Sequence, residues 1–107
     1  MPDAGDLIWL TFDPQAGHEQ RGRRPALVLS PRVFNAKASL ALVCPITSKV
    51  KGRMFEVLVR AGRIEGAILV SHVKSLDWRE RHAEFAGKAD AVAVDEVRER
   101  LRPLLGL

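Results

Sequence analysis

The residues best suited to chemistry in this chain are arginines that stand between a glycine-containing segment and a short apolar run. Arg23 and Arg24 directly precede Pro25. Pro25 has no amide hydrogen and biases Arg24 toward extended backbone, so residues 26–29 are predicted to form a strand that is buried on both faces. A guanidinium at the rigid start of a core strand is pre-organised to bind two phosphate oxygens. The competing interpretation of Arg24 is a surface salt-bridge partner.

The segment before these arginines carries groups that can accept a proton. Gly17 and Gly22 permit backbone conformations that are closed to other residues, so residues 15–22 are predicted to form a long loop rather than a tight turn. If this loop closes on a ligand, the carboxylate of Glu19 or the imidazole of His18 can act as a general base. The competing interpretation is that Glu19 pairs with neighbouring arginines and that His18 is solvated.

A second polar segment begins at Thr47, two residues after Pro45. The threonine hydroxyl has little rotational freedom, and it can orient a phosphate or accept a hydrogen bond. A basic loop is predicted to follow it. The cations expected to bind the backbone of a nucleic acid are those of this loop and of the first segment: Lys49, Lys51, Arg53, Arg21 and Arg23. The alternatives are an ordinary turn threonine and a solvated charged hairpin.

Short strands have to hold these candidates in place. Runs rich in β-branched and aromatic residues, bounded by glycine, proline or aspartate, are typical of strands. The predicted strands are residues 6–12, 26–29, 40–45, 55–59, 68–78 and 84–87, with the third ending at Pro45 and the fifth bending through its middle. Many short strands with glycine turns favour a compact antiparallel barrel, mostly β with short helices.

Two segments have helical features. Ser30 is a predicted N-cap with a proline directly after it, which favours a short helix over residues 31–36. Apolar residues recur at helical spacing over residues 94–105, with charged residues between them, and predict a C-terminal amphipathic helix. Pro103 is expected to kink or separate its last turn, and Gly106 to cap it.

Composition limits the class of protein. A chain of 107 residues is expected to be one domain over 1–107, and its net charge of +4 and pI near 9.8 favour polyanionic partners. Cys44 is the lone cysteine, which excludes an internal disulfide and fits a reducing compartment such as the cytoplasm. No run is long enough to span a membrane and no signal segment opens the chain. The histidines lack metal-ligand spacing, so no metal site or cofactor is expected.

Four motifs, in order and covering nearly the whole chain, resemble the MazF/PemK-type toxins. They are Gly5-Asp-Leu-Ile-Trp-Leu-Thr-Phe-Asp-Pro14, Gly17-His-Glu-Gln-Arg-Gly-Arg-Arg-Pro25, Val43-Cys-Pro-Ile-Thr-Ser48 and Val73-Lys-Ser-Leu-Asp-Trp78. The resemblance implies an SH3-like antiparallel barrel and a homodimer. It also implies metal-independent, sequence-specific cleavage of single-stranded RNA by the toxin of a toxin-antitoxin pair, with attack by the 2′-hydroxyl to give 2′,3′-cyclic phosphate and 5′-hydroxyl ends.

By the same resemblance, Arg24 and Thr47 fall on the family's catalytic arginine and threonine, and Glu19 on its loop glutamate. An acidic antitoxin protein is the expected partner, because a cationic groove can bind an acidic segment that folds into it. His72 stands where the family tends to carry glutamine, so the cleavage sequence does not carry over. Two other functions remain open, a noncatalytic RNA-binding barrel and a gyrase-poisoning toxin on the same fold.

Overall fold

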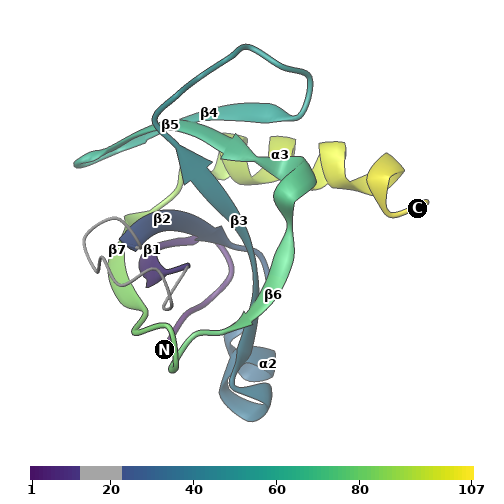
Figure 1. Ribbon diagram of the computed structural model, residues 1–107. Helices are drawn as coiled ribbons and strands as arrows, with labels where there is room; N and C mark the ends of the chain where they lie inside the picture. The colour runs from purple at the N-terminus through teal and green to yellow at the C-terminus, as the bar shows by residue number, and fades with distance from the viewer. Residues whose placement is uncertain (13–22) are drawn as a thin grey trace.

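The computed structural model describes residues 1–12 and 23–107. Within these residues the chain forms seven strands of one curled antiparallel sheet, two α-helices and a short 3-10 helix (Figure 1). The elements are β1 (Asp6–Thr11), β2 (Arg23–Val28), α2 (Arg32–Ala38), β3 (Leu40–Thr47), β4 (Glu56–Ala61), β5 (Ile64–Leu69), η1 (Val70–His72), β6 (Lys74–Asp77), β7 (Glu84–Lys88) and α3 (Ala91–Leu104). No helix among the described residues is long and apolar enough to cross a membrane.

The sheet curls into a half-barrel with β3 at its centre. Its strand order is β4-β5-β3-β2-β1-β7, and β6 pairs with β3 outside this path. The β4–β5 hairpin and α3 lie together at one end of the half-barrel, and α2 lies at the other (Figure 1). The predicted mostly-β antiparallel fold with a C-terminal helix is therefore confirmed.

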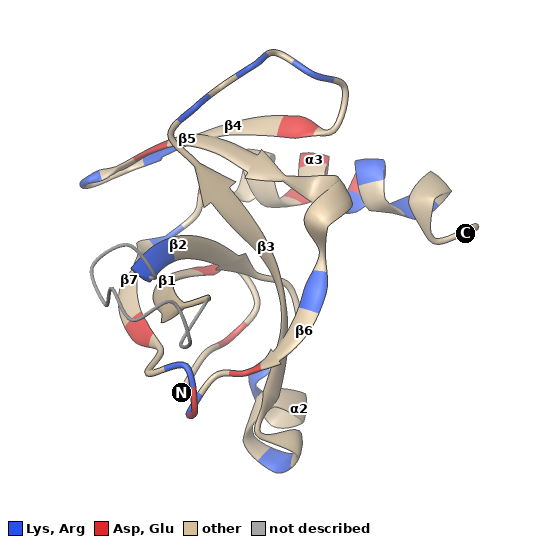
Figure 2. Cartoon of the chain, in the orientation of Figure 1, with Lys and Arg blue, Asp and Glu red and all other residues tan. Residues whose placement is uncertain are grey.

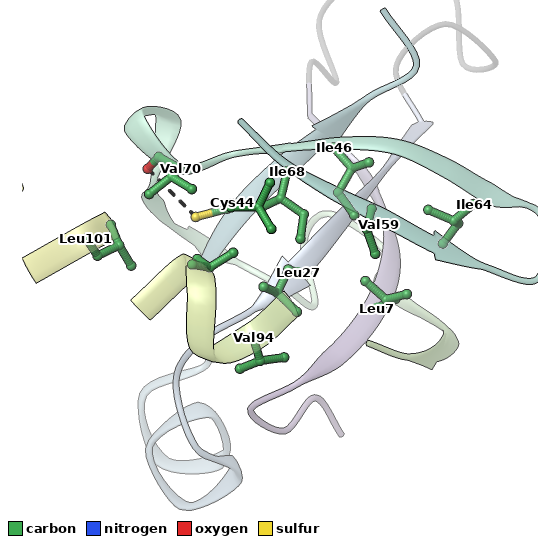
Figure 3. Packing of buried hydrophobic residues seen from close by; sticks show 12 residues of the cluster. Leu7, Leu27, Cys44, Ile46, Val59, Ile64, Ile68, Val70, Val94 and Leu101 are labelled. Carbon is green, nitrogen blue, oxygen red and sulfur yellow. Dashed lines mark hydrogen bonds between the residues drawn. The ribbon is translucent and has the colours of Figure 1, made fainter. Parts of the chain in front are cut away.

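The central strands bury both of their faces. Alternate side chains point to opposite sides of a strand, so β1, β2 and β3 each contribute to two hydrophobic clusters. One cluster packs against α3 and includes Leu7, Leu27, Cys44 and Ile46 (Figure 3). The other fills the opposite face and includes Ile8, Leu10, Ala26, Val28 and Val43. Burial of residues 26–28 on both faces, as the sequence predicts, fixes the strand that carries Arg24.

Strand β3 changes partner along its length, and Pro45 therefore does not end it. Residues 40–43 pair with β6, whereas the last two residues of the strand pair with β5. The Leu42 carbonyl accepts a hydrogen bond from the Leu29 amide, so by alternation the Pro45 nitrogen faces the opposite edge, between the two partners. The hydrogen bonds between the strands therefore require no amide hydrogen at position 45, and a proline is tolerated there. The prediction that Pro45 stops the strand is wrong.

The single bent strand predicted over residues 68–78 is also wrong, because that segment forms the end of β5, then η1 and then β6. Ile68 pairs with Ile46, and Lys74 pairs with Val43. Between these two pairs lie five residues of this segment, 69–73, but only two residues of β3, 44 and 45. The extra residues leave the sheet edge and form the turn of 3-10 helix. Strand β5 itself begins earlier than predicted, at Ile64.

Helix α2 begins differently from the prediction. Its N-cap is Pro31, which makes no side-chain cap, and the Arg32 amide instead donates to Asp3 Oδ1 at 2.8 Å. This hydrogen bond is the main reason that the pKa of the Asp3 carboxyl lies below its ordinary value. Ser30 is not the N-cap, because its hydroxyl donates to Asn35 Oδ1 at 2.6 Å inside the fold.

Helix α3 confirms the predicted amphipathic helix. Its buried residues are Val94, Val97 and Leu101. The helix continues through Pro103 to Leu104, so the proline does not separate the last turn. Gly106 has a φ of 74°, and the Leu107 amide donates to the Arg102 carbonyl at 2.8 Å, which is the 6→1 bond of a Schellman motif. Gly106 therefore ends the helix as predicted.

Candidate functional site

A pocket of about 400 Å³ opens where the start of β2, the end of β3 and the β4–β5 turn meet. Its lining residues are Trp9, Arg23, Arg24, Pro25, Ile46, Thr47, Ser48, Lys49, Arg63, Ile64 and Glu65. Basic segments gather on this side of the molecule, at the start of β2, in the loop between β3 and β4, and at the tip of the β4–β5 hairpin (Figure 2). The pocket thus combines apolar side chains from the core strands with several cations.

Arg24 and Thr47, which stand far apart in the sequence, line this one pocket. Arg24 extends from β2 at the position opposite Leu10 of β1, and its side chain is exposed. Its guanidinium has no hydrogen bond or salt bridge to any acceptor in residues 1–12 and 23–107. With respect to the described residues, both terminal nitrogens of the fork are therefore available to a ligand in the pocket.

Arg23 points to the other side of β2 and makes a different set of contacts. Its guanidinium donates to the His82 carbonyl at 2.9 Å, to Thr11 Oγ1 at 3.2 Å and to Glu84 Oε1 at 2.9 Å. These bonds tie the start of β2 to the end of β1 and to β7. Adjacent arginines thus differ in environment. Arg23 is hydrogen-bonded within the fold and also lines the pocket, and its contact with RNA stays a prediction.

Thr47 is held at the end of β3 by its own turn and by β5. Its Oγ1 accepts a hydrogen bond from the Lys49 amide at 3.1 Å. Strand β5 approaches its backbone so closely that a Cβ on Gly66 would lie 2.0 Å from the Thr47 carbonyl oxygen. Only glycine fits at this contact, and it sets where the threonine stands in the pocket.

The loop after Thr47 carries Lys49, Lys51 and Arg53, and only Lys49 among them lines the pocket. Glu56 organises this loop, because its Oε1 accepts hydrogen bonds from the Lys51 amide at 2.9 Å and from the Gly52 amide at 3.0 Å. The other two cations are exposed and do not line the pocket. Their contact with RNA stays a prediction.

The sequence patterns did not predict that two charged residues, Arg63 and Glu65, line the pocket. Arg63 lies in the turn of the β4–β5 hairpin, and Glu65 lies in β5. The sequence predicts a strand that begins only at Ile68, whereas β5 begins at Ile64. The available signal was Gly62, which separates two runs of strand-forming residues and has a φ of 58°. Recognising a hairpin there would have placed both charges beside the end of β3.

Other predicted site residues lie elsewhere. His18, Glu19 and Arg21 fall outside the described residues. His72 is exposed in η1 and does not line the pocket. Among the described aromatic residues, only Trp9 lines it.

Three other aromatic residues lie outside the pocket. Trp78 packs on the second hydrophobic cluster and donates through Nε1 to the Asn35 carbonyl at 3.0 Å, and Phe55 packs on the first cluster. Phe34 is 41% exposed on α2, away from the pocket. Trp78 and Phe55 therefore contribute to the packing of the hydrophobic clusters.

Cys44 lies on β3, two residues from the pocket, and it is no nucleophile for the site. Its side chain is buried in the cluster under α3, and this burial raises the pKa of the thiol to about 12. A thiol with that pKa stays protonated near neutral pH. The polar chemistry of the pocket therefore rests on Arg24, Thr47 and the surrounding cations.

The arrangement is suited to one anion held between a guanidinium and a hydroxyl, with an apolar wall beside it. Arg24 supplies a planar fork of donors, and Thr47 supplies a donor or acceptor at a fixed place. Trp9, Pro25 and Ile46 offer surface for a ribose or a base. Such a pocket fits a phosphodiester with an attached nucleoside better than an isolated inorganic anion.

Comparisons with known proteins point to one protein family. The model of the PemK-like, MazF-like toxins of type II toxin-antitoxin systems matches residues 3–105. The chain is 41% identical over 106 residues to the endoribonuclease toxin MazF of Escherichia coli K12, covering 99% of this chain and 96% of that protein.

Solved structures give the same result. A crystal structure of MazF from Deinococcus radiodurans is 53% identical with a TM-score of 0.89, covering 99% of this chain and 97% of that one. A MazE-MazF structure from the same organism is 47% identical with a TM-score of 0.87, covering 99% and 96% of the two chains.

Proposed function

The chain belongs to the PemK-like, MazF-like toxin family of type II toxin-antitoxin systems, and from that premise we propose that it is an endoribonuclease that cleaves single-stranded RNA at specific sequences. The observation that carries the proposal is the meeting of Arg24 and Thr47 in one pocket beside apolar surface. This is the arrangement that a reaction at a phosphodiester of RNA requires. The protein acts as the toxin of its pair.

The reaction we propose needs no group beyond the RNA and the chain itself. The 2′-oxygen attacks its own phosphorus, the bond from phosphorus to the 5′-oxygen breaks, and the products carry a 2′,3′-cyclic phosphate and a 5′-hydroxyl. Negative charge gathers on the nonbridging oxygens during the attack, and the Arg24 fork stabilises it. Thr47 orients the phosphate so that the 2′-oxygen stands in line with the leaving oxygen.

The proton of the 2′-hydroxyl passes to Glu19 or His18 in this proposal, and the departing 5′-oxygen takes a proton in turn. Arg24 is not the acceptor, because a guanidinium stays protonated up to a pKa above roughly 12. The pH dependence of kcat in a variant of each residue distinguishes Glu19 from His18 as the proton acceptor. An unchanged pH-rate profile in both Glu19→Gln and His18→Ala would remove this role from the loop.

The direct test is incubation of the purified protein with a long single-stranded transcript in excess chelator. Fragments that end in 2′,3′-cyclic phosphate support the proposal, and sequencing their 5′ ends gives the recognised sequence. Intact RNA with salt-sensitive binding would instead support a noncatalytic RNA-binding barrel. Intact RNA together with inhibition of purified gyrase would support a gyrase poison. Arg24→Ala and Thr47→Ala exclude a contaminating nuclease.

We propose an acidic antitoxin as the partner, because a solved relative is a complex of MazE with MazF. The cations around the pocket and the loop before β4 favour a segment rich in carboxylates. Such a segment competes with RNA for the same charges. Titrating an acidic antitoxin peptide into the cleavage reaction should raise KM for RNA, and less so as salt increases.

We propose that the protein is a homodimer and that α2 and β3 provide its interface. Four apolar side chains are exposed together there: Val33, Phe34, Leu40 and Leu42, with exposed fractions of 63%, 41%, 37% and 42%. Exposed apolar side chains on two elements that contact each other suit a self-complementary contact. Leu42→Glu should give a monomer by light scattering at micromolar concentration, whereas Leu58→Glu on β4 should not.

The site of action in this proposal is the cytoplasm, where single-stranded mRNA is available. The unpaired, buried Cys44 is compatible with a reducing compartment. Recovery of the toxin with cytoplasmic RNA after cell fractionation is the expected result. Recovery with the envelope fraction would contradict it.

A further inference from the structure

The β4–β5 turn contributes a cation to the pocket that none of the roles above uses. We propose that Arg63 binds the RNA phosphate next to the scissile one, so that this turn forms a second phosphate-binding wall. Arg63, Arg24 and Thr47 line the same pocket, but Arg63 reaches it from a different hairpin. The inference rests on the proposed function, since it takes single-stranded RNA as the ligand.

The turn holds the backbone of Arg63 in a defined place. Ala61 pairs with Ile64, which leaves only Gly62 and Arg63 between the two strands. Gly62 has a φ of 58° at the first turn position, as a two-residue hairpin with glycine first requires. Ile64 is 4% exposed and packs in the core under α3. The arginine therefore stands beside an anchored residue and carries its charge at the rim of the pocket.

The charges around Arg63 favour a bound anion rather than an internal ion pair. Among the described residues Arg63 forms no salt bridge, although Glu65 lines the same pocket. Arg24 and Lys49 add positive charge on the other walls, so the pocket has more cations than carboxylates. Successive phosphates of a single strand place a negative charge at each nucleotide, and this spacing suits cations on two separate walls.

Glu65 provides a second test of the inference, because it lines the same pocket as Arg63 and carries a charge of opposite sign. A carboxylate at the pocket rim repels a phosphate, and removing its charge should strengthen binding of the same phosphate that Arg63 attracts. Arg63→Ala and Glu65→Gln should therefore change KM in opposite directions. A general loss of stability would not produce this pair of results.

The experiment uses the full chain and a labelled single-stranded RNA that contains one mapped cleavage site. Arg63→Ala should raise KM about tenfold, the effect expected for one charged hydrogen bond, with kcat changed by less than about twofold. The slope of log KM against log salt should fall by roughly 0.7, the value for one phosphate of a single strand. Arg98→Ala, an exposed arginine on α3 outside the pocket, is the matched control.

A KM for Arg63→Ala that stays within about twofold of the Arg98→Ala value would overturn the inference. A fall in kcat with unchanged KM would overturn it as well, because that result places Arg63 in the reacting step. Binding of a 2′-O-methylated copy of the RNA by fluorescence anisotropy gives an independent measure. If the wild-type protein leaves RNA uncut, the proposed function fails, and this anisotropy measurement still decides whether Arg63 contacts the strand.

Discussion

Polar side chains lie near both ends of β3. At one end they are hydrogen-bonded to groups of the fold, whereas at the other end the Arg24 guanidinium is available to a ligand. At the first end, the Asn35 side chain is fully buried and donates to the Pro2 and Ser30 carbonyls at 2.9 and 3.0 Å. The Ser30 hydroxyl donates to Asn35 Oδ1 and accepts from the Leu42 amide. At the second end, Arg24 is exposed and has no acceptor among the described residues.

Whether a polar group is hydrogen-bonded inside the fold distinguishes structural from functional groups more clearly than its residue type does. A buried amide whose donors and acceptor are all paired stabilises one arrangement of the chain, and it has nothing left to offer a substrate. An exposed guanidinium on a rigid strand adds little to folding but can bind an anion without reorganising. We therefore expect substitutions at the first end to lower stability and substitutions at the second to lower activity.

The largest expected effect is on catalysis at the second end. Arg24→Ala should lower kcat by about 100- to 1,000-fold, the usual cost of removing one pre-organised donor, with little change in melting temperature. Arg23→Ala is the neighbouring comparison. It should lower stability by about 1 to 2 kcal/mol, because Arg23 donates to His82, Thr11 and Glu84.

Single-turnover cleavage and thermal unfolding of both variants measure this contrast. If Arg23→Ala lost as much activity as Arg24→Ala while remaining folded, the division between the two arginines would fail. The conservative variant Arg24→Lys should recover only part of the rate, since an ammonium lacks the planar fork.

The next effect concerns stability at the first end. Asn35→Ala should lower the free energy of unfolding by about 3 kcal/mol, because it removes the acceptor of the Ser30 hydroxyl proton and the amide donor to the Pro2 and Ser30 carbonyls. Urea denaturation measures the change. Activity per folded molecule should stay near the wild-type value, and a large fall in kcat would show that the two ends of β3 are coupled.

Gly66→Ala tests whether the position of Thr47 matters beyond its hydroxyl. The added Cβ would lie 2.0 Å from the Thr47 carbonyl oxygen, so β3 and β5 have to separate. We expect a loss of about 1 to 3 kcal/mol in stability and about 10- to 100-fold in kcat. In the Thr47→Ala background the same change should cost little further activity, and an undiminished additional loss would contradict this positioning role.

The smallest effect is at Cys44, between the two ends. Burial raises the pKa of its thiol from 9.0 to about 12, so from pH 9 upward the unfolded chain loses this proton while the folded chain keeps it. Stability should therefore fall as pH rises above 9, by at most about 1.4 kcal/mol per pH unit from this group. Denaturation midpoints at pH 8 and pH 10 should differ less in Cys44→Ala than in wild type. Equal differences would refute the shift.

Local pattern identified the candidate residues and most of the elements. The proline after Arg24 and the continuous apolar run after it predict a strand over residues 26–29, and β2 contains residues 26–28 of that run, although it begins earlier, at Arg23. The period of apolar residues predicts α3, and a glycine three residues after Pro103 predicts its end. These features depend on neighbours within a few residues, which is why sequence alone reveals them.

The elements that the sequence missed depend on distant partners. Pro45 lies inside β3 because the strand changes partner there, and the segment after Ile68 leaves the sheet because β3 is too short to pair with all of it. Arg63 and Glu65 reach the pocket only because β5 pairs with the end of β3. Gly62 marks the turn of the β4–β5 hairpin, but the strands with which β3 and β5 pair have no signal in the residues around them.

The sequence by itself determined which residue types are available to the site, through the Gly-Arg-Arg-Pro segment, the threonine after Pro45 and the excess of cations. Only the tertiary structure decided that Arg24 and Thr47 line one pocket, that Arg23 is used for folding, and that the β4–β5 turn adds a further cation. The physical reason is the pairing of β3 with three other strands. Register across a sheet is set by the burial of many side chains at once, and no short stretch of sequence contains that information.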